Sequence, residues 1–548
     1  MLKKVLVANR GEVAVRIIRA CREMGIQSVA VYSEADKDAL HVKLADEAVC
    51  IGPAKSSKSY LNIKNIIETA CLTGCDSIHP GFGFLSENSH FAKICDEIGI
   101  KFIGPNYKMI DLMGNKSKAK ETMKKAGVPV VPGSEGVISS ISEAIKIVEK
   151  IGYPVILKAS AGGGGKGIRV AHTEEELIKE YDLVKQEAKN SFSDDSIYIE
   201  KFIENPRHVE VQVLADEHGN AVYLGERDCS IQRRHQKVLE ESPSMAIDEK
   251  IRRKMGETVV KAVREVGYSN VGTIEFLVDK DKNYYFMEMN TRLQVEHPVT
   301  EFITGIDIVK EQIRIASGEK LKYSQKDITF TGHAMECRVN AENPSKNFMP
   351  CPGKITGLHL PGGNGIRVDT AIYADYTIPA CYDSMIAKVI VHGNNRNECI
   401  AKMKSALGEF IVEGITTNID FLYNNSFEYE NKILCGTRGW SLVDEEIDEK
   451  LINRELGRLE LSLQDGAKKA GENKEIIVFM HYPPITKNKI LSEEEMKFIE
   501  LMKKYNVKRC YYGHLHGNSI YDAVEGKIQG IELKLVSADG LDFKLIKI

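Results

Sequence analysis

The chain has 548 residues and a formal net charge of −4, so it is too long for one hydrophobic core and is expected to fold as three or four domains. Its slightly acidic balance gives no reason to expect nucleic acid or a membrane surface as a partner, and the apolar run Val5–Ala8 is too short for a signal peptide or a membrane span. Twelve cysteines without a Cys-x-x-Cys pair fit reduced thiols better than disulfides or a zinc site, so we expect a cytoplasmic protein.

The first hundred residues alternate short strands with helices. Lys4–Ala8 and Gln27–Tyr32 have the composition of buried strands, and Gly11–Met24 and Ile63–Thr73 that of helices. This alternation predicts an α/β domain with a parallel, doubly wound sheet. Only one glycine lies in the first strand-to-helix turn, so the dinucleotide-binding fingerprint is absent.

Two features of this region remain open from the sequence. Arg16, Arg19 and Glu23 lie on the polar side of the first helix, where they face either solvent or another copy of the chain. The segment His79–Asn88 is a glycine-rich turn with several aromatic residues. It is either a packed loop or part of a site.

A glycine-rich segment follows a strand in the second region of the chain. Tyr153–Lys158 reads as a strand that ends in a lysine, and four glycines occupy positions 162–165. Without Cβ atoms, their backbone N–H groups can wrap an anion. No Ser or Thr follows Lys166 and no helix begins there, so this is not a Walker loop. We expect a mobile lid that covers phosphates rather than a plain linker.

Three further segments of this region carry polar side chains. Tyr198–Phe202 is a predicted strand whose backbone could hydrogen-bond an adenine, and His208–Val213 alternates polar and apolar residues as a half-buried strand does. Arg227–Leu239 is dense in cationic and polar groups. Such a run is often a solvated face, but a cationic approach to bound phosphates is an equally good interpretation here.

The segment Phe286–Pro298 is the one around which these features are organised. Side chains alternate between the two faces of a strand, so Glu288, Asn290 and Arg292 are expected to point the same way. A carboxylate, an amide oxygen and a guanidinium would then lie in a row.

A second apolar run, Val271–Val278, precedes this segment and carries one acid, Glu275. We predict a hairpin in which Asp279 pairs with Tyr284, which places Glu275 opposite Glu288. Two carboxylates and an amide oxygen are the ligands that Mg²⁺ prefers when it is held together with phosphates. The alternative is an exposed hairpin with salt bridges.

The residues after Gly332 predict a mostly β region closed by a helix. Gly332–Val339 is a strand that carries Arg338, and a helix is predicted over Arg396–Glu409. Further short strands between glycine and proline turns are predicted at Pro352–Leu360, Gly365–Asp369, Thr377–Pro379 and Met385–His392.

Taken together, the order of these motifs, from Lys116 and Lys158 through the four glycines to Glu288-Met-Asn-Thr-Arg and Val295-Glu-His-Pro, resembles biotin carboxylase. That family is an ATP-grasp enzyme and the ATP-using component of acetyl-CoA carboxylase. The resemblance covers Met1 to about Asn424. It implies a pre-ATP-grasp parallel-sheet domain at 1–113, an ATP-grasp domain at 114–330 with a mobile lid near 131–203, and a mostly β carboxylase C-terminal domain at 331–424.

The resemblance also implies a role for individual positions. A nucleotide site for ATP would be formed by Lys116, Lys158, Gly164, Gly165, Glu200, Lys201, Phe202, Ile203, His208, Gln232 and His235. Two Mg²⁺ or Mn²⁺ ions would be bound by Glu275, Glu288 and Asn290. Bicarbonate would be positioned by Lys237, Arg292 and Val295, with Glu296 as its general base and Arg338 stabilising the biotin enolate. Phe82 departs from the family pattern, which has a tyrosine there.

The implied reaction is the ATP-dependent carboxylation of carrier-bound biotin with bicarbonate, the first half-reaction of acetyl-CoA carboxylase in fatty acid synthesis. The implied partners are a biotin carboxyl carrier protein, carboxyltransferase subunits and a second copy in a homodimer that uses the N-terminal and C-terminal carboxylase domains. No biotin-attachment motif is present, so the carrier belongs to another chain. A subunit of another acyl-CoA or pyruvate carboxylase is the alternative.

Residues 425–548 do not continue this family. The strand Ile476–Met480 runs into His481, and Gly513 begins a Gly-His-Leu-His motif with His514 and His516. This resembles the C-terminal half of a calcineurin-like metallophosphoesterase, whose histidines at these positions lie at a dinuclear metal centre. The carboxylate-bearing motifs of the other half are missing, so we do not expect a metal-dependent phosphohydrolase. We expect an incomplete α/β fragment, an orphaned half-sheet with exposed apolar faces and unpaired edges.

Overall fold

The structure is a computed structural model, and it describes residues 2–134, 136–159, 168–192, 196–234, 236–419, 426–429, 431–437, 439, 449–471, 473–485, 487 and 493–537. It divides into two compact units. The first consists of Met1–Arg338, Gly362–Tyr376 and Ile386–Met403, and the second of Val339–Pro361, Thr377–Met385 and Lys404–Ile548. Among the described residues, no helix combines the length and the apolar character needed to cross a bilayer.

The chain begins with a five-stranded parallel sheet in the order β3-β2-β1-β4-β5, as predicted. Its strands are β1 (Lys4–Val7), β2 (Gln27–Ser33), β3 (Glu47–Gly52), β4 (Ser77–His79) and β5 (Lys101–Phe102). Its helices are α1 (Gly11–Glu23), α2 (Leu40–Leu44), α3 (Ile63–Leu72) and α4 (Ser89–Glu97). The central strand β1 is the most apolar, and Val5, Leu6 and Val7 are fully buried.

The strand order reverses between β1 and β4, so the loops that leave these two strands meet. Asn9 donates from Nδ2 to the carbonyl oxygens of Pro80 (2.7 Å) and Phe82 (2.8 Å). Gly81 has φ +64°, and a Cβ there would lie 2.9 Å from the Asn9 amide, so the close approach needs glycine. The turn His79–Asn88 is therefore a packed loop at the switch point of the sheet.

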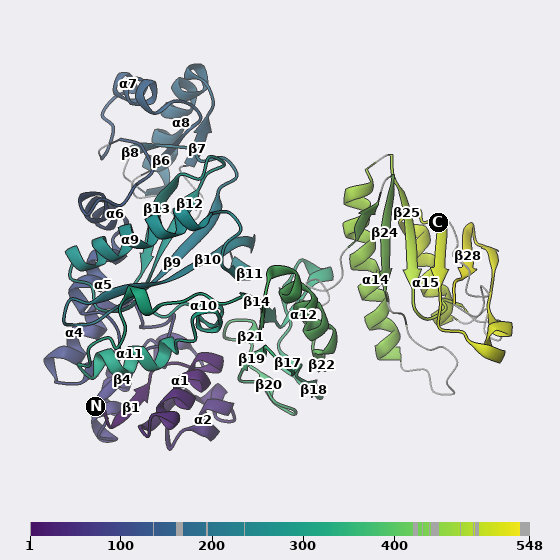
Figure 1. Ribbon diagram of the computed structural model, residues 1–548, viewed down its shortest axis with the longest axis horizontal. Coiled ribbons are helices and arrows are strands. Elements are labelled where there is room, and N and C mark those ends of the chain that lie inside the picture. Colours follow the sequence, from purple (N-terminus) through teal and green to yellow (C-terminus); the bar gives the residue numbers. More distant parts are fainter. Residues whose placement is uncertain are drawn as a thin grey trace. The chain divides into compact units, whose positions relative to one another are not determined.

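Two helices, α5 (Tyr107–Gly114) and α6 (Lys116–Lys125), connect this sheet to a small subdomain. The subdomain has three antiparallel strands in the order β7-β6-β8, namely β6 (Val155–Ala159), β7 (Ile168–Ala171) and β8 (Ile197–Lys201). Figure 1 shows α7 (Ile141–Ile151) and α8 (Glu174–Phe192) packed on these strands. Their shared core of apolar side chains makes the subdomain a separate packing unit, as expected of a lid.

The largest sheet has eight strands in the order β13-β12-β9-β10-β11-β14-β21-β19. The strands are β9 (Arg207–Ala215), β10 (Ala221–Arg233), β11 (Gln236–Ser242), β12 (Asn270–Val278), β13 (Tyr284–Asn290), β14 (His333–Asn340), β19 (Ile366–Thr370) and β21 (Met385–Gly393). The helices along it are α9 (Glu249–Glu265), α10 (His297–Thr304), α11 (Ile308–Ala316) and α12 (Arg396–Glu409). The strands predicted after Gly332 thus extend the sheet that carries the Glu275–Glu288 hairpin.

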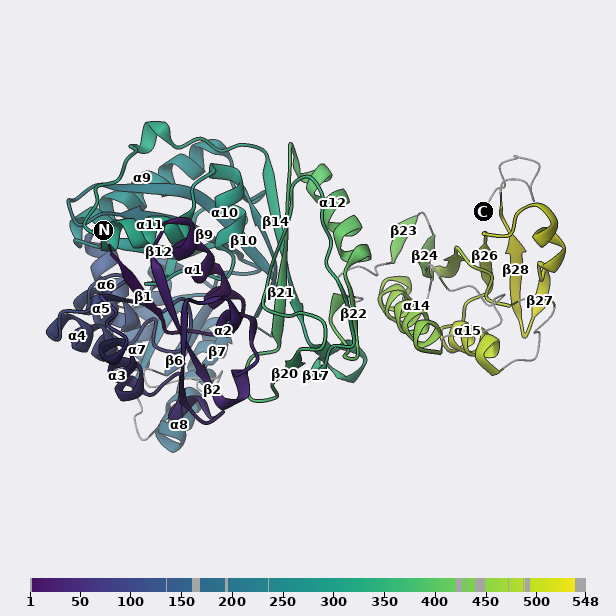
Figure 2. The ribbon, with the colours of Figure 1, turned by 90° about the horizontal axis from the view of Figure 1, so that it is seen from below.

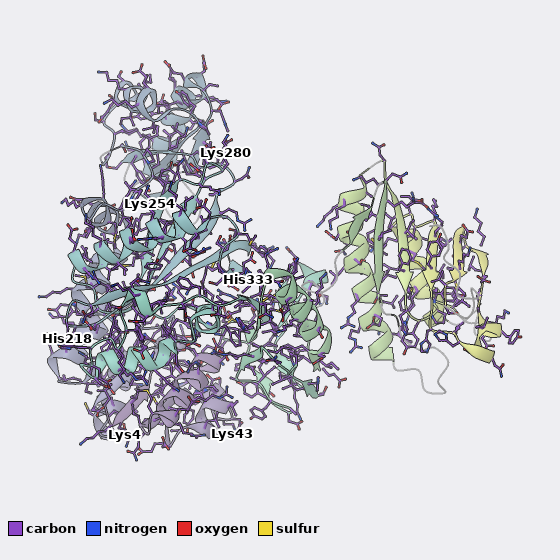
Figure 3. The ribbon with its side chains drawn as sticks, viewed as in Figure 1. Lys4, Lys43, His218, Lys254, Lys280 and His333 are labelled. Atoms are coloured by element: carbon purple, nitrogen blue, oxygen red, sulfur yellow. The ribbon has the colours of Figure 1, made fainter. Side chains whose placement is uncertain are left out.

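Charged side chains tie the late strands to the early ones. His333 at the start of β14 (labelled in Figure 3) lies 2.9 Å from Glu241 Oε2, and Arg396 donates to the same oxygen over 2.6 Å. On the other edge, Lys254 of α9, also labelled in Figure 3, lies over the ring of Tyr284. The register of the whole sheet is thereby fixed from both ends.

Three two-stranded ribbons belong to the second unit. They pair β15 (Glu342–Asn343) with β16 (Met349–Pro350), β17 (Gly353–Lys354) with β20 (Thr377–Ile378), and β18 (Gly357–His359) with β22 (Ile411–Glu413). They account for the short strands predicted between glycine and proline turns.

The tail forms a six-stranded sheet in the order β23-β24-β25-β26-β28-β27. Its strands are β23 (Phe427–Tyr429), β24 (Lys432–Thr437), β25 (Glu475–Met480), β26 (Arg509–Tyr512), β27 (Gly526–Ile528) and β28 (Ile531–Leu535), with helices α14 (Glu449–Ala470) and α15 (Glu493–Lys504). The four inner strands are parallel and the two edge strands are antiparallel to their neighbours. The predicted α/β character is confirmed.

The prediction that this tail exposes its apolar faces is wrong for the part of it that the structure describes. Both crossover helices lie along one face of the sheet (Figure 2), because successive right-handed crossovers in one direction place them there. Val478 and Leu533 of the sheet and Leu463 and Phe498 of the helices are at most 1% exposed. The tail therefore buries a core of its own.

Candidate active site

Three carboxylates lie in a row across neighbouring strands of the large sheet. Glu210 of β9 is paired with Glu275 of β12, which is paired with Glu288 of β13. The predicted facing of Glu275 and Glu288 is confirmed, and Glu210 is a third member that sequence reasoning missed. Like charges that face one another destabilise a sheet unless cations separate them.

The route to this register differs from the predicted one. Val278, not Asp279, pairs with Tyr284, which alone would shift Glu275 out of line with Glu288. A bulge restores the alignment, because β13 has one more residue than β12 between Phe276 and Glu275. The pairing of Asp279 with Tyr284 is therefore wrong, although its consequence is right.

Lys237 of β11 provides the first compensating cation. Its Nζ lies 2.6 Å from Glu210 Oε2, 3.1 Å from Glu275 Oε1 and 2.7 Å from Glu296 Oε1. Burial alone would lower the pKa of this ammonium, but the carboxylates around it hold the pKa well above its usual value. Lys237 is thus a permanent positive charge at the centre of the site.

Glu296 is the carboxylate on which the cations converge. It immediately precedes α10 and is fully buried. Its Oε1 accepts from Lys237, and its Oε2 accepts from Arg338 Nη2 over 3.0 Å. Burial raises the pKa of Glu296, but these cations outweigh it and hold the pKa well below the usual value. Glu296 is therefore ionised throughout the neutral range.

Arg338 has a second carboxylate partner in the interior. Its Nε donates to Glu240 Oε1 over 2.6 Å. Burial raises the pKa of Glu240 to about 7, against the lowering effect of Arg338. Arg338 is accordingly held rigidly between two acids of neighbouring strands.

The predicted metal ligands lie together at the edge of the same site. Asn290 donates from Nδ2 to Glu275 Oε1 over 2.9 Å, and its Oδ1 accepts from Arg292 Nη2 over 3.0 Å. Burial, and then the charge of Glu210, raises the pKa of Glu275 to about 7. Glu288 is partly exposed and lies 3.4 Å from Lys116 Nζ. An excess of carboxylate oxygens with a raised pKa fits a divalent cation, which would relieve that repulsion.

Cations from three elements gather at the boundary with the lid. Lys158 Nζ donates to Glu200 Oε2 over 2.7 Å, and Lys120 of α6 pairs with Glu200 Oε1. Burial acts to raise the pKa of Glu200, yet these two lysines lower it. With Lys116 at the start of α6, they provide the positive charge that nucleotide phosphates require.

The remaining predicted nucleotide residues occupy less decisive positions. The backbone N–H groups of Lys201 and Phe202 donate to the carbonyls of Pro132 (2.8 Å) and Pro154 (3.0 Å), so they are committed within the fold. His208 donates from its backbone nitrogen to Ser230, and Gln232 donates to the carbonyl of Cys229. Ile203 is nearly buried. The predicted residues Gly164, Gly165 and His235 lie outside the described residues.

Two further side chains act in this site without having been predicted. Arg227, which is fully buried, donates from Nε to Glu210 Oε1 over 2.5 Å and from Nη1 to Thr300 Oγ1 over 2.9 Å. Glu87 of the N-terminal loop accepts from Arg292 Nε over 2.7 Å. The alternation of β9 marks Glu210 as inward-facing, but nothing local marks the partners of Arg227 or Glu87.

This geometry combines an ionised buried carboxylate, two fixed cations beside it and a hard-oxygen edge next to a cluster of lysines. Such a set can bind a small anion, accept its proton and neutralise charge on a transferred phosphoryl group. Comparison with known proteins agrees. Family models match residues 1–110 (biotin carboxylase, N-terminal domain), 115–324 (carbamoyl-phosphate synthase L chain, ATP binding domain) and 336–428 (biotin carboxylase C-terminal domain).

Biotin carboxylase 1 of Bacillus subtilis is 62% identical over 422 residues, which cover 77% of this chain and 94% of that one. The chain belongs to the biotin carboxylase family. Biotin carboxylase of Haemophilus influenzae is 57% identical over 438 residues, 80% of this chain and 97% of the relative. The chain is accordingly an ATP-dependent ligase that carboxylates biotin with bicarbonate.

Solved structures agree with this fold. The biotin carboxylase domain dimer of the Hydrogenobacter thermophilus 2-oxoglutarate carboxylase, in complex with MgADP, ADP and bicarbonate, is 54% identical with a TM-score of 0.70. It covers 77% of this chain and 93% of its own. A Campylobacter jejuni biotin carboxylase in a β,γ-ATP complex is 53% identical with a TM-score of 0.71, over 77% of this chain and 94% of its own.

Proposed function

We propose that Glu296 is the general base of the reaction and that Lys237, Arg292 and Val295 position its bicarbonate substrate. The observation that supports this most is the burial of Glu296 between Lys237 and Arg338. A proton moves from the bicarbonate hydroxyl to Glu296 while the bicarbonate oxygen bonds to the γ-phosphorus of ATP and the bond to ADP breaks. The low pKa keeps the acceptor form populated, and the same cations attract the bicarbonate anion.

The nucleotide would lie beside the lysine cluster. Lys116 and Lys158 would hold its phosphates, and Glu275, Glu288 and Asn290 would hold two divalent cations. Those ions supply neutralisation of phosphate charge when they are bound. The side chain of Arg338, fixed by Glu240, would offer its guanidinium to the enolate oxygen of biotin, with Glu296 as its other neighbour.

A single measurement tests the assignment of the base. ATP hydrolysis is followed with bicarbonate and free biotin, each omitted in turn, in wild type and in Glu296→Gln. We expect the variant to retain ADP binding and to lose bicarbonate-dependent turnover. Carboxybiotin formation at the wild-type rate in Glu296→Gln would remove this residue from the mechanism.

We further propose that the biotin is carried by a separate carrier protein and that carboxyltransferase subunits use the product, as in acetyl-CoA carboxylase of fatty acid synthesis. The alternative acceptor is pyruvate, because one of the two pyruvate carboxylase components of Methanothermobacter thermautotrophicus is 55% identical over 421 residues, 86% of that relative. Transfer assays with acetyl-CoA and with pyruvate distinguish the two. The twelve free thiols support a cytoplasmic location.

We also propose a homodimer. The polar side of α1 opens into a groove lined by Arg16, Arg19 and Glu23 together with Asp307 and Arg367. Charges of both signs on one small surface suit a self-complementary contact with a second copy. Sedimentation of the wild type and of Arg19→Glu tests this, since reversal of one charge should shift the population toward monomer.

A further inference from the structure

The turn that leads into α10 holds the backbone of Glu296 by its carbonyl groups. Gln294 O lies 2.8 Å from His297 Nδ1. Val295 O accepts a hydrogen bond from Lys388 Nζ over 2.8 Å. The first contact is local, whereas the second comes from a strand 93 residues away in the sequence.

Lys388 of β21 is an unusual donor because its side chain is 0% exposed. Two carboxylates balance its charge, Glu12 of α1 at 3.3 Å and Asp369 of β19 at 3.7 Å. A buried ammonium costs stability unless it is paired and hydrogen-bonded. The fold therefore assembles three elements around Lys388, and the carbonyl of Val295 lies closer to its Nζ than either carboxylate does.

The consequence for Glu296 follows from the planarity of the peptide bond. The carbonyl of Val295 lies in the same plane as the nitrogen and Cα of Glu296. A hydrogen bond that fixes this oxygen also fixes the direction in which the Glu296 side chain leaves the backbone. The carboxylate then reaches both Lys237 and Arg338 at hydrogen-bond distance.

We propose that Lys388 is a positioning residue for the carboxylation reaction: through the carbonyl of Val295, it sets the orientation of Glu296. Lys388 touches neither substrate nor metal ligands and acts only through the turn. This inference rests on the proposed role of Glu296 as base. It assigns a function to a buried charge that the reaction itself does not use.

The experiment uses the full chain and two variants of Lys388. Lys388→Met removes the donor but leaves Glu12 as a buried charge, so it is accompanied by Glu12→Gln/Lys388→Met, in which both charges are gone. Asp369 retains its pair with Arg367 over 2.7 Å in both variants. Two single variants serve as controls. Lys402→Met removes another lysine that donates to a backbone carbonyl, that of His392 over 2.7 Å. Glu12→Gln keeps the bond from Lys388 to Val295.

For the double variant we expect kcat/KM for bicarbonate to fall about 10- to 100-fold, since small misplacements of a catalytic group cost that much. KM for ATP and the dissociation constant of ADP should stay within about twofold, because the lysine cluster is untouched. Glu12→Gln and Lys402→Met should remain near wild type. Addition of Glu296→Gln should cause no further loss beyond that of Glu296→Gln alone, because both changes remove the same function.

Three outcomes overturn the proposal. A double variant with wild-type bicarbonate kinetics shows that the carbonyl bond is not needed. Equal losses in ATP affinity, or a double variant that does not fold, assign Lys388 to stability alone. If Glu296→Gln itself proves active, the proposed base fails, and this result is distinguishable because it does not depend on Lys388.

Discussion

The sheet that holds the active site and the sheet of the tail both place polar side chains on neighbouring strands, yet only the first assembles a site. On β9, β12 and β13, three carboxylates face one another and buried cations separate them. In the tail, His481 and His514 follow the adjacent strands β25 and β26 at an N···N distance of 3.2 Å, and both are exposed. The difference is one of charge compensation rather than of residue type.

The described residues contain one group of three or more metal-capable side chains, Glu210, Cys229 and Glu296. That group is part of the carboxylase site, and Lys237 bonds to both of its carboxylates. The histidines of the tail gather no third ligand among the described residues. Two imidazoles without a carboxylate cannot neutralise hard divalent cations. A matching motif is therefore not sufficient for a site.

The largest effect that separates the two regions is expected from Glu296→Gln. Loss of the proton acceptor should lower bicarbonate-dependent ATP turnover roughly 100- to 10,000-fold while ADP binding persists. Steady-state kinetics and calorimetric ADP titration measure both quantities. Glu311→Gln, at another buried glutamate on the next helix, is the matched control and should lose much less turnover. Equal losses in the two variants would contradict a specific role for Glu296.

The next effect concerns the carboxylate row at its exposed end. Glu288→Gln removes one hard-oxygen ligand, so half-maximal activity should require about tenfold more Mg²⁺, with less change at saturating Mg²⁺. A Mg²⁺ titration of ATP turnover provides the test. Asp281→Asn, at the tip of the same hairpin, should leave the titration unchanged. An unaltered Mg²⁺ requirement in Glu288→Gln would exclude Glu288 as a ligand.

The same comparison shows what the sequence can predict. The facing of Glu275 and Glu288 was predictable because both lie on strands joined by one short turn, where alternation and register are local. The bulge that corrects the register was not predictable. Lys237 and Arg338 were assigned through the family resemblance.

Contacts between distant segments escaped the sequence. Glu210 meets Glu275 only because β9 pairs with β12, and Lys388 meets Val295 only because β21 joins the same sheet. No periodicity encodes which strands become neighbours when they lie far apart along the chain. The tail was misjudged for a related reason, since the packing of its helices on the sheet depends on crossovers and not on strand composition.

A third prediction tests the independence of the tail core. Leu463 on α14 is fully buried among tail residues. Leu463→Ala should cost about 2–5 kcal/mol of the tail's unfolding free energy, because it leaves a cavity. Thermal unfolding should then show an earlier transition, while carboxylase turnover at room temperature stays near wild type. Lys468→Ala, on an exposed position of the same helix, should change neither.

A loss of carboxylase activity in Leu463→Ala that Lys468→Ala does not share would show that the two regions are coupled. An unfolding curve without an earlier transition would show that the tail has no separate core to destabilise.

The smallest effect is expected at the histidines of the tail. His481→Ala and His514→Ala remove side chains that touch no residue of the proposed carboxylase site, so biotin carboxylation should stay within about twofold of wild type, as for most surface substitutions. The full chain should hydrolyse no phosphodiester substrate with Mn²⁺, Fe²⁺ or Zn²⁺, because the carboxylates that would compensate such ions are missing. A fragment of residues 1–424 should still bind ATP, since every proposed site residue precedes its end. The full chain, the two variants and the fragment are assayed side by side on biotin and on a phosphodiester. Metal-dependent hydrolysis that vanishes in His514→Ala or in the fragment would reveal a working second active site, and the contrast between the two sheets would then fail.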